Sequence, residues 1–255
     1  MKNPTFNNGC LCLGVMCILL VAVFTSAQQT PPHWEYKGKD GPKNWGKLDP
    51  RYSNCSMGHL QSPINITGAK KSDLPALIFD YKLVPLNIIN NGHTIQLNYA
   101  PGSSLTVGGK TYTLKQFHFH HPSEEHVNGH GFDMVVHLVH SDGEGHLAVV
   151  AVLLQRGDAS AFIGTIWKHI PEEMEKTVDV PDVILNVKDL LPTDQGYYTF
   201  AGSLTTPPCS EGVTWFVLKT PVSLSANQLA EFAKLYPRDA RPIQPINGRE
   251  ILETQ

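Results

Sequence analysis

The chain has 255 residues and is 41% hydrophobic, which is ample apolar material for a buried core. Its formal net charge at pH 7 is −3, from 20 basic and 23 acidic residues. This balance favours neither nucleic acid nor an anionic membrane surface as a partner, so we expect a small molecule or an ion.

Residues 1–27 resemble a secretory signal peptide. Lys2 gives the N-terminal region a positive charge, residues 11–24 form an unbroken apolar run, and small residues at 25–27 suit a cleavage site. The run is short for a membrane span, so an uncleaved anchor is the weaker alternative. We therefore expect an exported protein, periplasmic in a bacterium and otherwise secreted, with no membrane association after cleavage.

Export also determines how the cysteines are interpreted. Three of the five lie in the signal segment, which leaves Cys55 and Cys209 in the mature chain. An even pair in an oxidising compartment favours one disulfide across a long loop, and two separate buried thiols are the alternative. Glycosylation sequons begin at Asn54 and Asn65 and matter only if the host glycosylates exported proteins.

The mature segment, residues 28–255, contains no repeat or low-complexity linker, so we expect a single domain. Residues 31–57 are rich in Gly, Pro and aromatic residues and predict an irregular N-terminal segment. Residues 77–154 consist mostly of short β-type runs separated by turn signals such as Asn91-Gly92. Two later segments, 197–204 and 213–220, are also strand-like.

Two helices are predicted. Apolar residues within 161–170 fall on one helical face, and Pro171 ends that pattern. Residues 226–236 carry a second apolar stripe, where Ser225 can cap the helix and Gln228 can return the bond. Because strands dominate and short turns join many of them, we predict a mainly β (α+β) fold with a largely antiparallel sheet and peripheral helices.

Three of the twelve histidines form a chemical pattern. His118 and His120 are two residues apart in a strand-like run, so their rings share one face. His137 lies in a second apolar strand-like run, and all three rings can converge if the two strands are neighbours. Three neutral imidazoles with an open position form a catalytic zinc site, whereas structural zinc sites use four protein ligands.

For each histidine alone, an ordinary core or surface role is the alternative. The other histidines do not extend the pattern. His121 and His140 are expected to face away from the three rings and to be structural. Five more histidines are interpreted as ordinary turn, surface or helix residues: His33, His59, His130, His146 and His169.

Eight segments occur in a specific order: GPKNW (41–45), QSPINI (61–66), INNGH (89–93), QFHFHHPSEEH (116–126), VHLVH (136–140), LAVVAVLL (147–154), SLTTPPC (203–209) and VTWFV (213–217). In these segments the chain resembles an exported, bacterial-type α-class carbonic anhydrase, from His33 to Arg249. The resemblance implies one domain on a twisted, mainly antiparallel sheet of about ten strands. It also implies a lyase that reversibly hydrates carbon dioxide to bicarbonate and a proton.

The resemblance assigns one Zn²⁺ per chain to His118, His120 and His137. Thr205 matches the hydroxyl that accepts the proton of zinc-bound hydroxide, which attacks carbon dioxide. Glu125 matches the carboxylate that accepts a hydrogen bond from Thr205.

Glu124 is the carboxylate next to Glu125, and the assignment to Glu125 rests on the histidine that directly follows it. His93 matches the proton shuttle, although a turn histidine is the alternative on sequence alone. The substrate-binding positions are Val139, Val149, Leu204, Thr205, Thr206 and Trp215. The polar groups that order water or orient a ligand are Tyr36, Asn91, Gln96 and Gln116.

The resemblance also pairs Cys55 with Cys209 and implies cis peptide bonds before Pro63 and Pro208. One position departs from the pattern, because many relatives carry a carboxylate two residues before the third histidine, where this chain has Val135. That carboxylate would accept a hydrogen bond from the outer nitrogen of His137, the ring nitrogen that does not face the metal. Without it a backbone carbonyl, water or another side chain must do so, and we expect weaker zinc retention or a shifted water pKa.

Three other functions remain open at this point. An inert binding or storage protein on the same fold would keep the metal without chemistry, a zinc hydrolase would act on esters, and a zinc buffer would bind several ions. The presence of all three histidines, Thr205, Glu125 and an apolar pocket favours the carbonic anhydrase interpretation. The sequence leaves the organism, the turnover rate, the physiological direction and a homodimer undecided.

Overall fold

The computed structural model describes residues 1, 2, 4 and 32–255, and every helix and strand lies in the last range. Except for those three positions, the expected signal peptide lies outside the described residues. Residues 32–255 form one unit. In this described part of the chain no helix is both long and apolar enough to cross a membrane.

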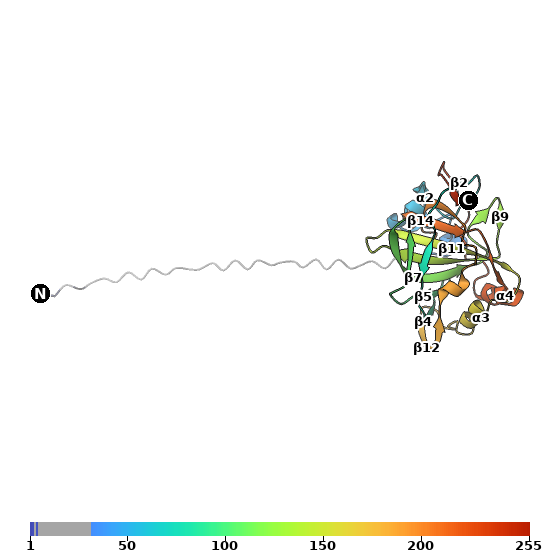
Figure 1. Ribbon diagram of the computed structural model, residues 1–255. Helices are drawn as coiled ribbons and strands as arrows, with labels where there is room; N and C mark the ends of the chain where they lie inside the picture. The colour runs from blue at the N-terminus through green and yellow to red at the C-terminus, as the bar shows by residue number, and fades with distance from the viewer. Residues whose placement is uncertain (3, 5–31) are drawn as a thin grey trace. The chain divides into compact units, whose positions relative to one another are not determined.

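A large twisted sheet forms the centre of residues 32–255 (Figure 1). Within the described residues it has 13 strands, of which ten follow the path β12-β4-β5-β7-β10-β11-β14-β13-β16-β2. Most neighbours are antiparallel, but β11 pairs in parallel with β14 and β15, and β16 pairs in parallel with β2. The prediction of a mainly antiparallel sheet of about ten strands is confirmed.

The strands of this sheet are β2 (Lys70–Ser72), β3 (Ile78–Asp80), β4 (Val84–Asn90), β5 (Ile95–Asn98), β6 (Ser104–Val107), β7 (Lys110–His120), β10 (Met134–Ser141), β11 (Leu147–Arg156), β12 (Thr177–Leu185), β13 (Tyr197–Ser203), β14 (Glu211–Leu218), β15 (Val222–Leu224) and β16 (Leu252–Thr254). A small separate sheet contains β1 (Asn65–Ile66), β8 (His126–Val127) and β9 (His130–Gly131).

The helices are short and lie around the sheet. The α-helices are α1 (Trp45–Leu48), α2 (Asn54–Met57), α3 (Ala161–Trp167) and α4 (Ala226–Leu235). Single 3₁₀ turns occupy Gly38–Asp40, Pro50–Tyr52 and Val187–Leu190.

Both predicted helices form, and both end before the predicted residue, α4 by one residue at Leu235. Ser225 caps α4, and the side chain of Gln228 returns the bond, so the predicted capping box is present. Helix α3 ends at Trp167, three residues before the predicted end. Ile170 precedes Pro171, and the proline ring disfavours a helical conformation in the residue before it, so the last turn loosens early.

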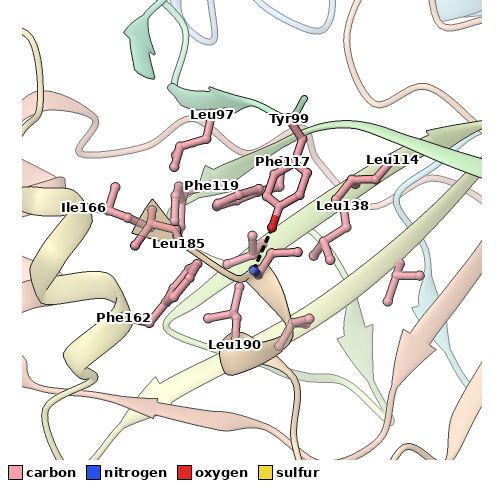
Figure 2. Packing of buried hydrophobic residues seen from close by; sticks show 14 of the residues in the cluster. Leu97, Tyr99, Leu114, Phe117, Phe119, Leu138, Phe162, Ile166, Leu185 and Leu190 are labelled. Atoms are coloured by element: carbon pink, nitrogen blue, oxygen red, sulfur yellow. Dashed lines mark hydrogen bonds between the residues drawn. The ribbon is translucent and has the colours of Figure 1, made fainter. Parts of the chain in front are cut away.

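Side-chain alternation along β7 divides the apolar core from the histidines. Phe117 and Phe119 are fully buried in the main core cluster, together with Leu138 of the neighbouring strand (Figure 2). His118 and His120 alternate with Phe117 and Phe119 along the strand and therefore point to the opposite face of the sheet. The period-2 prediction for this strand is confirmed.

The N-terminal segment is held to the rest of the unit by aromatic packing and a disulfide. Trp45 is fully buried, and Trp34 and Tyr36 pack against the cluster that contains it. Cys55 and Cys209, 154 residues apart, form the disulfide that the resemblance implied.

The peptide bonds before Pro63 and Pro208 are cis, as the resemblance also implied. The bond between His121 and Pro122 is cis as well, which was not foreseen. It lies directly after the second histidine of β7, in the loop that carries Glu124 and Glu125.

Candidate metal centre

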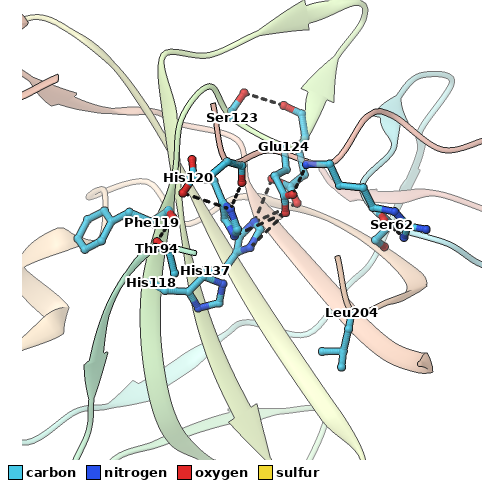
Figure 3. A network of polar contacts seen from close by, with 12 residues as sticks. Ser62, Thr94, His118, Phe119, His120, Ser123, Glu124, His137 and Leu204 are labelled. Carbon is cyan, nitrogen blue, oxygen red and sulfur yellow. Dashed lines mark hydrogen bonds and ion pairs between the residues drawn. The ribbon is translucent and has the colours of Figure 1, made fainter. Parts of the chain in front are cut away.

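The pairing of β7 with β10 brings the three predicted histidines together. His137 stands opposite His118 in the antiparallel register, and Val135 stands opposite His120. One ring nitrogen from each of the three histidines lies within 4.8 Å of the other two. Figure 3 shows the three rings converging from the two strands.

Each ring is held through one nitrogen by a protein acceptor. Nδ1 of His118 donates to Oε1 of Gln116 at 2.8 Å, and Nδ1 of His120 donates to the backbone carbonyl of Asp239 at 2.7 Å. Nε2 of His137 lies 3.1 and 3.2 Å from the two carboxylate oxygens of Glu125. These outer bonds fix which nitrogen of each ring carries the proton and which way the ring faces.

The remaining nitrogens are Nε2 of His118, Nε2 of His120 and Nδ1 of His137. Nε2 of His120 is buried and has no hydrogen-bond partner. Burial and the two neighbouring rings hold the pKa of His118 well below its ordinary value of 6.5, so the ring is neutral and its lone pair is available. Three imidazoles, each with one ring nitrogen not bonded to an outer acceptor, fit zinc, which takes three histidines at catalytic sites.

Two consecutive glutamates lie beside the rings, and they make different contacts. Oε1 of Glu124 accepts the backbone N–H of Arg241 at 2.7 Å, while its Oε2 has no hydrogen-bond partner. That free oxygen lies 3.6 Å from Nε2 of His120 and 3.8 Å from Nδ1 of His137.

Glu125 points elsewhere, to the outer nitrogen of His137. Among the described residues no hydrogen bond joins Glu125 to Thr205, so the contact expected for this pair is not formed. The carboxylate oxygen left without a partner belongs to Glu124. The physical reason is the backbone N–H of Arg241, which fixes Glu124 on the metal side of His137 and leaves Glu125 on the other side.

The four expected apolar residues form part of one cluster beside the metal centre. Val149 and Trp215 are 2% exposed, and Val139 and Leu204 pack against them from less buried positions. The ring of Trp215 meets that of His137 edge-on, with 4.9 Å between centroids. An apolar surface therefore adjoins the third histidine.

The polar side of the site is a cavity of about 130 Å³. It contains the four expected water-ordering residues and reaches two of the metal histidines. Its lining consists of Trp34, Tyr36, Asn91, His93, Thr94, Gln96, Gln116, His118, His120 and Thr206. Thr205, next to Thr206, is only 5% exposed.

His93 lies in this cavity against Trp34. The two rings stack with 3.7 Å between centroids and 9° between planes. Nδ1 of His93 is buried without a hydrogen-bond partner, and burial lowers the pKa of the ring below 6.5. The ring is therefore neutral at pH 7 and can accept a proton.

Sequence reasoning missed Asp239 and Arg241 as site residues. The Arg241 guanidinium is buried and donates to the side chain of Gln61 and to the backbone carbonyls of Ser62 and Cys55, and burial lowers its pKa to about 10. No periodic pattern marks either residue, because both act from an irregular segment near the C-terminus. Only the unusual combination of charged and proline residues around position 240 could have drawn attention to them.

The other histidines stay outside the centre, as expected. His140 is fully buried on the opposite side of β10, where Nδ1 donates to the carbonyl of Ala148 and Nε2 accepts from the Tyr81 hydroxyl. Nδ1 of His121 donates to the carbonyl of Asp133.

The fold and the site define a sheet-based protein with three converging histidines that could hold a metal ion. The sequence profile described as eukaryotic-type carbonic anhydrase matches residues 40–255. A carbonic anhydrase of Pectobacterium carotovorum is 42% identical over 238 residues, which cover 93% of this chain and 97% of that protein. The chain therefore belongs to the α-class, or eukaryotic-type, carbonic anhydrase family and is a carbonic anhydrase enzyme.

Solved structures agree with this placement. A hyperthermostable carbonic anhydrase from a hydrothermal vent chimney superposes with a TM-score of 0.85 at 42% identity, covering 88% of this chain and all of that one. The α-carbonic anhydrase of Thermovibrio ammonificans, solved with the inhibitor sulfanilamide, gives 0.84 at 39% identity over the same shares of the two chains. Family membership makes carbon dioxide and bicarbonate the substrate and product of this chain.

The buried His140 predicts a pH dependence of stability. Burial lowers its pKa from 6.5 to about 4 in the folded state. Below pH 6.5 the unfolded chain takes up a proton that the folded chain does not, so the folded state loses stability as the pH falls from 6.5 to 4. At 1.36 kcal/mol per pKa unit, the free energy of unfolding falls by about 3 kcal/mol over this range.

Urea unfolding at pH 7 and pH 5 measures this effect. His140→Gln should lose less stability between the two pH values than the wild type does. His130→Gln, at an exposed position, serves as the control and should keep the wild-type difference. Equal pH dependence in the His140 variant and the wild type would contradict the prediction.

Proposed function

We propose that the chain binds one Zn²⁺ through His118, His120 and His137 and hydrates carbon dioxide at that centre. The observation that carries the proposal is that each ring has its outer nitrogen bonded to a protein acceptor and its other nitrogen turned toward the other two rings. When bound, zinc supplies Lewis acidity that lowers the pKa of a coordinated water to about 7, a value for which carbonic anhydrases are themselves the reference case.

Thr205 orients the attacking oxygen in this proposal, and Glu124 takes the role first assigned to Glu125. If the Thr205 hydroxyl donates its hydrogen bond to the free oxygen of Glu124, the hydroxyl oxygen can only accept a hydrogen bond from the attacking group. The hydrogen of that group is then fixed, and its lone pair faces the substrate. The buried, unpartnered Oε2 of Glu124 supports this assignment, since a buried acceptor without a donor is costly.

The apolar surface receives carbon dioxide, which has no charge and no dipole. Val139, Val149, Leu204 and Trp215 offer such a molecule contact without competing for it by hydrogen bonds. The backbone N–H of Thr205 can donate to an oxygen of the bicarbonate that forms. The neighbouring Thr206 lines the cavity and can contact the product.

His93 carries the proton away. Its ring is neutral at pH 7 and shares a cavity with two of the metal histidines, so a short chain of waters can link them. Tyr36, Asn91 and Gln96 line the same cavity and would order those waters. Gln116 also fixes His118.

We further propose that residues 1–27 are a signal peptide and that residues 28–255 are one exported catalytic domain. The disulfide supports an oxidising location, because such bonds persist outside the cytosol. A bacterial host would place the enzyme in the periplasm.

The proposal is tested by stopped-flow carbon dioxide hydration with a pH indicator, together with metal analysis. The wild type should carry one zinc per chain and hydrate carbon dioxide. His118→Ala removes one of three ligands and should lose both the zinc and the activity. Wild-type protein with a full complement of zinc and no hydration would instead support the inert binding protein.

Thr205 and Glu124 should act as a unit. Thr205→Val and Glu124→Ala each remove one member of the hydrogen bond that we propose, and each should lower kcat/KM on the order of 10²-fold. The double variant should lose little more than either single variant, because the second change has no bond left to break. Losses that multiply in the double variant would show that the two residues act separately.

His93→Ala should lower kcat on the order of 10²-fold in dilute buffer, because proton transfer becomes limiting. Adding imidazole buffer should restore much of the lost rate. His33→Ala is the matched control, since the His33 ring is exposed and 6.3 Å from that of His93, and it should have a smaller effect. A His93 variant that is slow and insensitive to buffer concentration would rule out the shuttle role.

A further inference from the structure

The outer nitrogen of His137 lacks the acceptor that the family pattern places on its own strand. That position is Val135, on the same face of β10 as His137. Val135 is fully buried and belongs to an apolar cluster with Ile64, Ile66 and Leu153. The strand therefore offers no carboxylate to the third histidine.

Glu125 provides a carboxylate from a different part of the chain. Both of its oxygens lie within hydrogen-bond distance of Nε2 of His137, at 3.1 and 3.2 Å. The residue is completely buried and comes from the loop between β7 and β8. The hydrogen bond that a glutamate at position 135 would make is thus already formed from outside the strand.

The backbone around Glu125 is fixed on both sides. The Ser123 hydroxyl donates to the Glu125 carbonyl at 3.0 Å and accepts the backbone N–H of Phe132 at 2.8 Å. Directly after Glu125, the backbone N–H of His126 donates to the carbonyl of Ile64 at 3.2 Å. These bonds attach the loop to the small sheet and hold the carboxylate in place.

The charge of Glu125 has no other partner in the described part of the chain. A buried carboxylate is costly unless it is paired and hydrogen-bonded. The buried guanidinium of Arg241 donates to Gln61, Ser62 and Cys55 instead. The Glu125 charge is therefore compensated through the imidazole of His137, most effectively when a cation lies on the opposite nitrogen of that ring.

We infer that Glu125 is the positioning residue for His137, in place of the strand carboxylate that Val135 lacks. It holds the ring with Nδ1 facing the metal and strengthens that nitrogen as a ligand. The inference rests on the proposed zinc function and goes beyond it by naming the acceptor. If Glu125 has this role, the weaker zinc retention or shifted water pKa expected from Val135 should not occur, because the outer bond of His137 is present.

The rate of zinc release to a coloured chelator tests this role directly. Glu125→Ala should release zinc about 10- to 100-fold faster than the wild type, the usual cost of losing an outer partner of a metal ligand. Glu125→Gln keeps the shape and one acceptor oxygen but removes the charge, and it should fall between the two. If Glu125→Ala does not fold, as judged by near-ultraviolet circular dichroism, Glu125→Gln provides the same comparison.

A second-site variant separates positioning from general packing. Adding Val135→Glu to Glu125→Ala returns a carboxylate to the strand face of His137 and should slow zinc release again. Adding Val135→Ala to Glu125→Ala is the matched control and should not. In the wild-type background, Val135→Glu should bring no gain, because Nε2 of His137 already has an acceptor.

The outcomes distinguish the inference from the proposed function. A wild type without zinc or hydration would overturn the proposed function. A wild type with one zinc per chain, together with a folded Glu125→Ala or Glu125→Gln variant that releases zinc at the wild-type rate, would overturn only the inference. Rescue by Val135→Glu but not by Val135→Ala is the result that supports it.

Discussion

Antiparallel pairing of β7 with β10 in one register is the constraint on which the three-histidine site depends. With His137 opposite His118, the ring of His120 also reaches the same point. A shift of one residue would turn the histidines of one strand to the other face. The register is held by the opposite face, where Phe117 and Phe119 are fully buried, each worth about 1.5–3 kcal/mol of transfer free energy. The packing of the core therefore fixes where the three histidine rings lie.

The part of the site that follows from periodicity could be predicted from the sequence. Alternation placed His118 and His120 on one face and assigned His140 to the other, and the apolar run around His137 identified a second strand. These predictions succeed because side-chain direction in a strand is a local property. The cis bonds before Pro63 and Pro208 came from the family resemblance, which carries tertiary information that a single sequence does not show. The disulfide was favoured by the even pair of cysteines, and the resemblance paired them.

The part that depends on loops could not be predicted in the same way. Glu124 and Glu125 are adjacent, and no periodic pattern in the sequence indicates which of them faces the inner nitrogen of His137. The backbone N–H of Arg241, 117 residues away, decides this by bonding Glu124. The carbonyl that holds His120 belongs to Asp239, 119 residues away, and any residue type could provide it. Such partners leave no signature in composition or spacing.

The disulfide links these loop partners to the segment that carries Thr205. The backbone carbonyl of Cys55 accepts a hydrogen bond from the guanidinium of Arg241. The backbone N–H of Arg241 in turn donates to Glu124. Cys209 lies four residues after Thr205 in the loop that follows β13. The covalent bond between the cysteines therefore joins the segment that positions Glu124 to the segment that carries Thr205. The hydrogen bond that we propose between Glu124 and Thr205 requires both segments to be placed accurately, and the disulfide favours this placement.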